Sequence, residues 1–228
     1  FTYDPMNRQL TETTADGGFT KYEYDKVGNV LSVTGPRPDV TVRYTYDDLN
    51  RRISITDAEG YVANYEYNDR DKVIKVTDPR STAGAELFTA YEYDFLDRVV
   101  RIDRVVDQGQ IVSETYTYDA VGNRLTRTDV RGFVTEFEYD ELNRLTAMQE
   151  PAANEDGDPR LTLYTYDAAG NVITVTDPRG EDFVTERVYD AQNRLLVERR
   201  PQFSPIGSAS LVEFTFVYDA SGNILEAT

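Results

Sequence analysis

The 228-residue sequence contains no cysteine, no histidine and no tryptophan. Without cysteine the chain has no disulfide framework, no thiol nucleophile and no thiolate metal site. Without histidine it has no zinc site of the usual Cys/His kind and no Ser-His-Asp triad. These absences favour a scaffold over an enzyme.

Positive charge is also scarce, since 24 Lys and Arg stand against 41 Asp and Glu, for a net charge of −17. Nucleic-acid binding is therefore disfavoured, because contacts to phosphate need a basic surface, and so is docking on an anionic membrane. No stretch approaches the roughly 18 apolar residues of a membrane-spanning helix, so we expect no membrane insertion. Residues 1–4 lack the basic start and apolar run of a signal peptide, and there is no initiator Met. We expect the chain to be part of a longer protein.

Tyrosine, by contrast, is abundant, with 17 copies. A Tyr-Asp dipeptide recurs along the whole chain, and Tyr67-Asn68 is a tenth, variant copy. The spacing of the ten copies runs from 21 to 29 residues, which indicates a bare unit of 21 residues with loop insertions in the longer copies. The nine dipeptides are Tyr3-Asp4, Tyr24-Asp25, Tyr46-Asp47, Tyr93-Asp94, Tyr118-Asp119, Tyr139-Asp140, Tyr166-Asp167, Tyr189-Asp190 and Tyr218-Asp219.

The positions around each tyrosine are consistent from copy to copy. Two residues before it there is a second aromatic residue in every unit except one, which has Arg187. Seven residues after it there is Leu, Ile or Val, with Thr146 as the exception. Four residues after it there is always Gly, Asn or Asp, in chain order Asn7, Gly28, Asn50, Asp71, Asp97, Gly122, Asn143, Gly170, Asn193 and Gly222.

This pattern predicts a β-hairpin in each unit. Aromatic residues two positions apart point to one face of a strand, and the segments before the tyrosines are rich in β-branched and aromatic residues. The Asp opens a turn because its carboxylate can accept a hydrogen bond from a backbone amide two residues on. Gly, Asn or Asp three residues later tolerates positive φ, as a type I turn closed by a G1 bulge requires. A second turn follows in several units, as in 57–60, 129–132 and 177–180.

A single hairpin of this size cannot bury enough apolar surface to fold alone, so its aromatic face and its edges must contact neighbouring hairpins. We therefore predict an all-β chain in which residues 1–228 form about ten tandem antiparallel hairpins in one continuous sheet, with no separate domains.

The motifs at 118–125 (Tyr-Asp-x-x-Gly-Asn-x-Leu), 176–180 (Thr-Asp-Pro-Arg-Gly) and 162–167 (Thr-x-Tyr-x-Tyr-Asp) resemble the YD repeats of the Rhs family. That family includes bacterial polymorphic toxins, insecticidal toxin-complex components and the animal teneurins, and the resemblance covers essentially the whole chain. It implies a spiralling sheet that forms a hollow shell or barrel. In many members the shell encloses a toxic C-terminal segment, and in others the repeats serve adhesion. No core-closing segment associated with self-cleavage and no toxin segment is recognisable in this sequence.

The repetition of the Tyr-Asp pairs argues against catalysis, although both side chains can do acid–base chemistry. We predict that the tyrosines form the core or a cross-strand ladder, and that the aspartates and the glycines Gly28, Gly122, Gly170 and Gly222 form the turns. No GxGxxG, Walker or GxSxG motif is present. We propose no catalytic residue, no metal site and no cofactor.

Five residues after each tyrosine the sequence has Arg, Lys or Asn. Two interpretations remain open: a ladder that binds an anionic ligand, or basic side chains that pair with Asp or Glu across strands. The second is favoured in so acidic a chain. Residues 154–158 (Asn-Glu-Asp-Gly-Asp) hint at a calcium loop, but Thr165 stands where the closing Glu should be, so an exposed acidic loop is favoured. We also expect surface loops at 36–39, 81–86 and 201–210.

The leading functional hypothesis is a structural one: part of the wall of a secreted Rhs-type shell that contains or delivers a toxin or other cargo. One alternative is a repeat subunit of a cell-surface or extracellular fibre, and another is a module that binds glycans or a cell surface. The expected partners are other repeats of the same chain or neighbouring copies, and an enclosed polypeptide cargo or a surface glycan. The expected location is outside a bacterial cell or on its surface.

Overall fold

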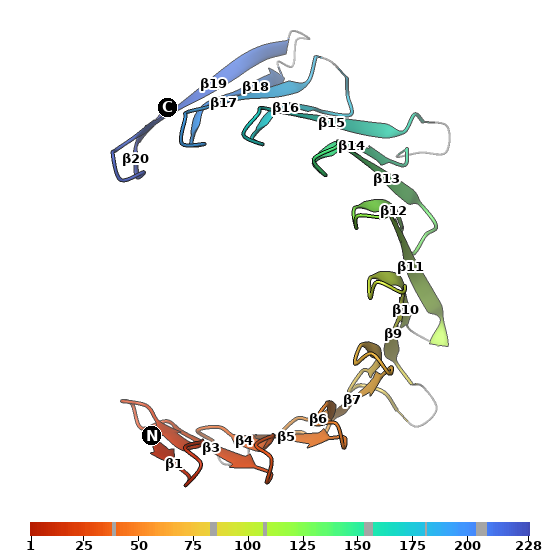
Figure 1. Ribbon diagram of the computed structural model, residues 1–228, viewed down its shortest axis with the longest axis vertical. Helices are drawn as coiled ribbons and strands as arrows, with labels where there is room; N and C mark the ends of the chain where they lie inside the picture. The colour runs from red at the N-terminus through yellow and green to blue at the C-terminus, as the bar shows by residue number, and fades with distance from the viewer. Residues whose placement is uncertain (38–39, 83–85, 107–108, 153–156, 181, 204–208) are drawn as a thin grey trace. The chain divides into compact units, whose positions relative to one another are not determined.

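The computed structural model describes residues 1–37, 40–82, 86–106, 109–152, 157–180, 182–203 and 209–228. The chain is all-β, with twenty strands in sequence order (Figure 1). This confirms the predicted hairpin array. The strands are β1 (Thr2–Tyr3), β2 (Gln9–Thr13), β3 (Phe19–Tyr24), β4 (Val30–Thr34), β5 (Thr41–Tyr46), β6 (Arg52–Thr56), β7 (Val62–Tyr67), β8 (Val73–Thr77), β9 (Phe88–Tyr93), β10 (Val99–Val105), β11 (Ile111–Tyr118), β12 (Arg124–Thr128), β13 (Val134–Tyr139), β14 (Leu145–Glu150), β15 (Arg160–Tyr166), β16 (Val172–Thr176), β17 (Val184–Tyr189), β18 (Leu195–Phe203), β19 (Ala209–Tyr218) and β20 (Ile224–Ala227).

The chain divides into two units, Phe1–Glu114 and Thr115–Thr228, and the division falls inside β11. In the first unit β1 to β10 pair antiparallel, each with the next along the chain. In the second unit the rest of β11 and β12 to β20 do the same. The prediction of an array without separate domains stays a prediction.

Every Tyr-Asp unit is a hairpin with an irregularity at the same place. In the β3–β4 hairpin Glu23 lies opposite Ser32, whereas Tyr24 lies opposite Val30, so one extra residue is accommodated beside the tyrosine. The same register shift occurs in all ten hairpins. A four-residue turn that closes through a positive-φ residue requires such a bulge.

The second turns connect one hairpin to the next without a register shift. The amide of Asp57 donates to the carbonyl of Tyr61 at 3.0 Å, and that of Asp129 to the carbonyl of Phe133 at 2.8 Å. Between β18 and β19 the sequence predicted a loop over residues 201–210. Part of this range is strand instead, since β18 runs to Phe203 and β19 begins at Ala209, with Pro201 opposite Leu211, whereas residues 204–208 lie outside the described residues. An antiparallel strand uses only every second amide toward a given neighbour, so a proline can occupy a position whose N–H is not needed.

The two faces of each sheet differ in chemistry. On one face the aromatic residue before the Tyr-Asp pair lies opposite an aliphatic one, as in Tyr44 with Ile55 and Tyr164 with Val175. The opposite face carries hydroxyl pairs, such as Thr117 with Thr126, whose oxygens are 2.7 Å apart. Alternation along the strand produces this separation, since successive side chains point to opposite faces.

Each unit is a sheet one layer thick. Among the described residues Ala147 is the one hydrophobic residue that is buried, and no large side chain is fully buried. The aromatic face is therefore half-buried by its own side chains and by no second layer. No helix in the described part of the chain is long and apolar enough to cross a membrane.

Candidate functional site: the ladder of Tyr-Asp turns

The aspartate that opens each hairpin turn binds the turn's own backbone. Asp25 Oδ1 accepts hydrogen bonds from the amides of Val27, Gly28 and Asn29, at 3.0, 2.7 and 2.8 Å. The equivalent carboxylate accepts such bonds in the other eight Asp turns, and the side-chain oxygen of Asn68 does so in the variant unit. The aspartate thus occupies the position where the sequence predicted a turn-former.

The residue four positions after each tyrosine has positive φ in all ten turns. The six non-glycine members have φ between 59° and 62°, and Gly28, Gly122, Gly170 and Gly222 have φ between 88° and 107°. Only Gly, and to a lesser degree Asn and Asp, adopt this backbone conformation readily. The restriction of the sequence to these three residue types therefore has a backbone cause.

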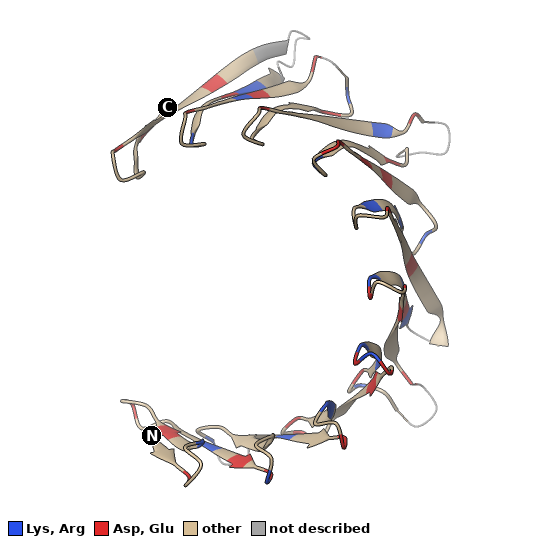
Figure 2. Ribbon diagram, viewed as in Figure 1, with Lys and Arg blue, Asp and Glu red and all other residues tan. Residues whose placement is uncertain are grey.

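The second carboxylate oxygen of the turn aspartate binds the side chain four residues on. Asp140 Oδ2 accepts from Arg144 Nε at 2.7 Å, and Asp167 Oδ2 accepts from Asn171 Nδ2 at 2.8 Å. Hydrogen bonds from the Arg144 amide and side chain lower the pKa of Asp140, and the Asn171 side chain and amide lower that of Asp167. Figure 2 shows acidic and basic residues together at several of these turns. A carboxylate held in this way is a poor general base near neutral pH.

In eight hairpins the tyrosine hydroxyl binds the hairpin before it, a contact that the sequence did not predict. Tyr166 Oη donates to the carbonyl of Leu145 at 2.7 Å, and Tyr46 Oη to that of Val30 at 2.9 Å. The acceptor is in each case the residue five positions after the preceding turn's opening residue. The same bond is formed by Tyr24, Tyr67, Tyr93, Tyr139, Tyr189 and Tyr218, at distances of 2.7 to 3.2 Å. The one available signal was the fixed place of both positions within the repeat, since the spacing between them varies from 15 to 23 residues.

The arginine of a turn also contacts the following hairpin. The guanidinium of Arg144 lies 4.6 Å from the centre of the Tyr166 ring, and Arg194 lies 4.7 Å from that of Tyr218. These are cation–π distances. The sequence predicted basic side chains paired with acids across strands, whereas the structure places the acid in the same turn. Since each of these guanidiniums already has a carboxylate and a ring as partners, the anionic-ligand interpretation has no structural support.

Arg187, the exception to the aromatic pattern, has a matching exception opposite it. Glu198 stands across the strand pair where most other units carry an aliphatic residue, and it is 4% exposed. Arg187 Nε binds Glu198 at 2.7 Å, and Arg200 binds the same carboxylate. An ion cluster therefore replaces one aromatic–aliphatic pair.

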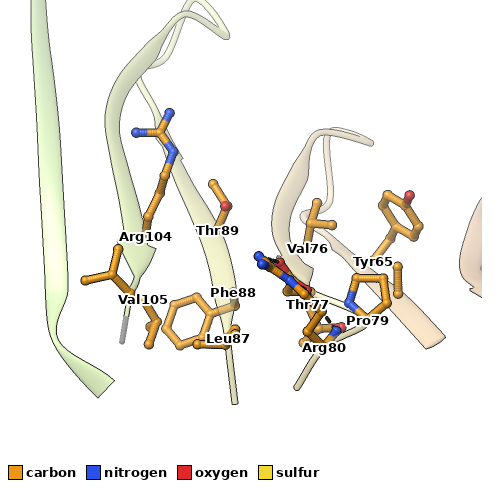
Figure 3. Close-up of a pocket in the computed structure, with 13 residues that line it drawn as sticks. Tyr65, Val76, Thr77, Pro79, Arg80, Leu87, Phe88, Thr89, Arg104 and Val105 are labelled. Carbon is orange, nitrogen blue, oxygen red and sulfur yellow. Dashed lines mark hydrogen bonds and ion pairs between the residues drawn. The ribbon is translucent and has the colours of Figure 1, made fainter. Parts of the chain in front are cut away.

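A hollow of about 630 Å³ in the first unit lies beside the long second turn that starts at Asp78 (Figure 3). Its wall mixes polar and apolar residues and includes Val76, Leu87 and Phe88. Its two arginines are already paired, Arg80 with Asp78 at 2.7 Å and Arg104 with Glu114 at 2.5 Å. The Arg80 side chain lowers the pKa of Asp78 to about 2. The hollow thus offers no acid or base suited to neutral pH.

The described part of the chain contains no cluster of acidic side chains that could hold a metal ion. Three residues of the acidic segment that hinted at a calcium loop, Asn154, Glu155 and Asp156, lie outside the described residues.

The Teneurin YD-shell family profile matches residues 77–206, and the RHS Repeat profile matches residues 24–62 and 46–83. The chain belongs to the YD-shell family. A crystal structure of TcdB2-TccC3 matches 99% of this chain with a TM-score of 0.56 at 17% identity. The Tc holotoxin pore of Photorhabdus luminescens matches 96% with a TM-score of 0.52 at 16% identity.

This chain spans 15% and 14% of the length of those two chains, and at such identities the likeness concerns the fold alone. No match was found among curated proteins. The family is a structural one built from YD repeats.

Proposed function

We propose that this chain is a structural segment in the wall of a secreted Rhs-type shell, which contains or delivers a toxin or other cargo. The observation that carries the proposal is the single-layer sheet with a half-buried aromatic face. Globular domains cover such a face with a second layer of secondary structure. A wall needs no second layer, because it extends sideways by adding hairpins.

The contacts between hairpins suit extension of this kind. Each Tyr-Asp turn supplies a carbonyl and, in the arginine-bearing units, a guanidinium to the next hairpin, and the next hairpin supplies a hydroxyl and a ring. An inner hairpin can therefore bind the hairpin before it through its tyrosine and the hairpin after it through its turn. Such nearest-neighbour contacts are how repeat proteins build long surfaces.

Membership of the YD-shell family supports containment over catalysis. The carboxylates of the turns are held in their charged form by hydrogen bonds, and the sequence contains neither Cys nor His. We assign the chain no enzymatic activity. The proposed partners are further repeats and an enclosed polypeptide, and the proposed location is outside the bacterial cell.

Electron microscopy of the natural full-length protein that carries these residues tests the proposal. We expect hollow, closed particles with a wall one sheet thick. Long filaments would overturn the shell in favour of an extracellular fibre. A glycan array with the 228-residue chain addresses adhesion, since binding at low micromolar concentration would favour a binding module.

A further inference from the structure

Two positions in consecutive turns vary together. The donor position is the fourth residue after the turn's opening residue and carries Asn, Arg or Lys. The acceptor position is the positive-φ residue of the next turn and carries Gly, Asn or Asp. Asn at a donor position is always followed by Asn, and Arg or Lys is always followed by Gly or Asp. The nine pairs are Arg8 with Gly28, Asn29 with Asn50, Arg51 with Asp71, Lys72 with Asp97, Arg98 with Gly122, Asn123 with Asn143, Arg144 with Gly170, Asn171 with Asn193 and Arg194 with Gly222.

An asparagine donor reaches the side chain of the next turn. Asn171 Nδ2 donates to Asp167 Oδ2 at 2.8 Å and to Asn193 Oδ1 at 2.9 Å. The same bond of 2.9 Å joins the other two Asn–Asn pairs, Asn29 with Asn50 and Asn123 with Asn143. The short asparagine side chain therefore needs the side-chain amide oxygen of an Asn in the next turn as its acceptor.

An arginine donor reaches past that position to the backbone. Arg144 Nη1 donates to the carbonyl of Asp167 at 3.1 Å, and Arg8 Nη1 to that of Asp25 at 2.8 Å. In both cases the guanidinium also covers the tyrosine ring of the next hairpin. No acceptor side chain is needed, and glycine stands at the acceptor position.

Space within the turn does not dictate the glycine. A Cβ atom added at Gly28, Gly122, Gly170 or Gly222 would meet no heavy atom within 4 Å. Six other turns place Asn or Asp at the same position with φ near 60°. The glycines have φ between 88° and 107°, so an Asn there would shift the turn toward the φ near 60° of the other six. With space available at every turn, the choice between Gly and Asn correlates with the donor of the preceding turn.

Simple alternation of two repeat types does not explain the pairing either. Arg51, Lys72 and Arg98 stand in three consecutive units, which breaks the alternation. There the acceptor position becomes acidic. Arg51 Nη1 lies 2.7 Å from Asp71 Oδ1, and Lys72 Nζ lies 3.5 Å from Asp97 Oδ2. The chemistry of the acceptor changes with that of the donor.

We propose that these two positions form a recognition code between hairpins. A turn with an asparagine donor accepts a neighbour with Asn at its positive-φ position, and a turn with a basic donor accepts one with Gly or Asp. In an array of nearly identical hairpins, such a code favours one neighbour over another and opposes misordered pairing, to which repeat proteins are prone.

Transfer of one pair to another junction tests the code. The single variants Arg144→Asn and Gly170→Asn each place one half of an Asn–Asn pair where the other half is missing. The double variant completes the pair. Protection of the β14 and β15 amides against hydrogen exchange reports the local opening constant for all four proteins. If the two substitutions acted independently, their free-energy effects on opening would add in the double variant. We expect the double variant to be about 2- to 10-fold better protected than this sum predicts. Strict additivity overturns the code.

A second pair of variants, which change only Asn to Gly, tests the code even if Arg144→Asn fails to fold. Asn193→Gly removes the acceptor of Asn171, whereas Asn7→Gly makes the same change at a position that no described side chain uses as acceptor. Glycine suits positive φ at both sites. We expect Asn193→Gly to lose about 2- to 10-fold in protection of its turn relative to Asn7→Gly. Equal effects at the two sites contradict the proposal.

Discussion

At the scale of the residue, the aspartate of the Tyr-Asp pair is the group on which each turn depends. Asp47 Oδ1 accepts from the amides of Leu49 and Arg51, and its Oδ2 binds Arg51 Nε at 2.7 Å. Asp48 is exposed and has no side-chain bond in the described structure. The two residues are neighbours with the same charge, so a substitution of Asp48 is a control for the same substitution of Asp47.

We expect Asp47→Ala to lower the Tm by about 2–4 °C, because the turn amides lose their acceptor. Asp48→Ala removes the same charge and should change the Tm by less than about 1 °C. Differential scanning calorimetry of both variants measures the difference. Equal shifts would show that net charge, and not the turn, governs stability here.

The turn carboxylates also predict how stability depends on pH. The pKa of Asp78 is lowered from 3.8 to about 2, first by the Arg80 side chain, and the pKa values of Asp140 and Asp167 are lowered as well. A carboxylate with a lower pKa in the folded state stabilises the protein above its unfolded pKa, and this contribution is lost as the pH falls through the folded value.

We therefore expect the free energy of unfolding to fall as the pH drops from about 4 toward 2, as urea titrations at a series of pH values would measure. Asp78→Asn should flatten part of that slope. A stability that stays constant across this window would contradict the assigned hydrogen bonds.

Much of this residue-level structure could be read from the sequence. The positive-φ positions and the turn aspartates were predicted because backbone geometry restricts each to a few residue types. The partner of Arg144 was misplaced, since a pattern of charges does not show whether a side chain folds back on its own turn. The Asn171–Asn193 bond links residues 22 apart and needed the structure.

At the scale of the element, hairpins are joined through the tyrosine hydroxyls. Tyr166 and Tyr164 lie on the same strand and the same face, but only Tyr166 donates to a carbonyl of the preceding hairpin among the described contacts. We expect Tyr166→Phe to reduce the free energy of unfolding by about 0.5–1.5 kcal/mol. Tyr164→Phe, the control, should leave it nearly unchanged. Urea denaturation compares the two, and an equal loss would mean that the hydroxyl bond contributes nothing specific.

The cluster of Arg187, Glu198 and Arg200 offers a second test on one strand pair. Arg187→Tyr alone leaves the nearly buried Glu198 with one partner, and we expect a loss of about 1–3 kcal/mol. Adding Glu198→Val restores the aromatic–aliphatic pair of the other units, so the double variant should match or exceed the original stability. Failure of Glu198→Val to rescue would indicate that the cluster has a role beyond filling this position.

The strands themselves were predictable where the repeat is bare and less so where it is interrupted. Alternation and the turn residues predicted β3 to β8 unit by unit. Around residues 201–210 the Pro, Ser and Gly content suggested a loop, yet β18 runs to Phe203 and β19 begins at Ala209. A loop was expected because these residue types favour turns. Hydrogen bonding to the long partner strand nevertheless keeps the described residues of this segment in strands.

At the scale of the whole molecule, the account depends on the sheet being a single layer. The repeat predicted a continuous sheet but not its thickness, because an aromatic face is equally compatible with a second layer. The near absence of buried hydrophobic residues in the described chain shows that each unit is a single layer. A wall of this kind accounts for the abundance of tyrosine without a conventional core.

Small-angle X-ray scattering of the 228-residue chain tests this central claim most directly. We expect scattering from sheets one layer thick, with a cross-sectional thickness of about 10 Å. A curve without this thin dimension, as a globular protein with a covered aromatic face would give, would contradict the single-layer wall and the function proposed from it.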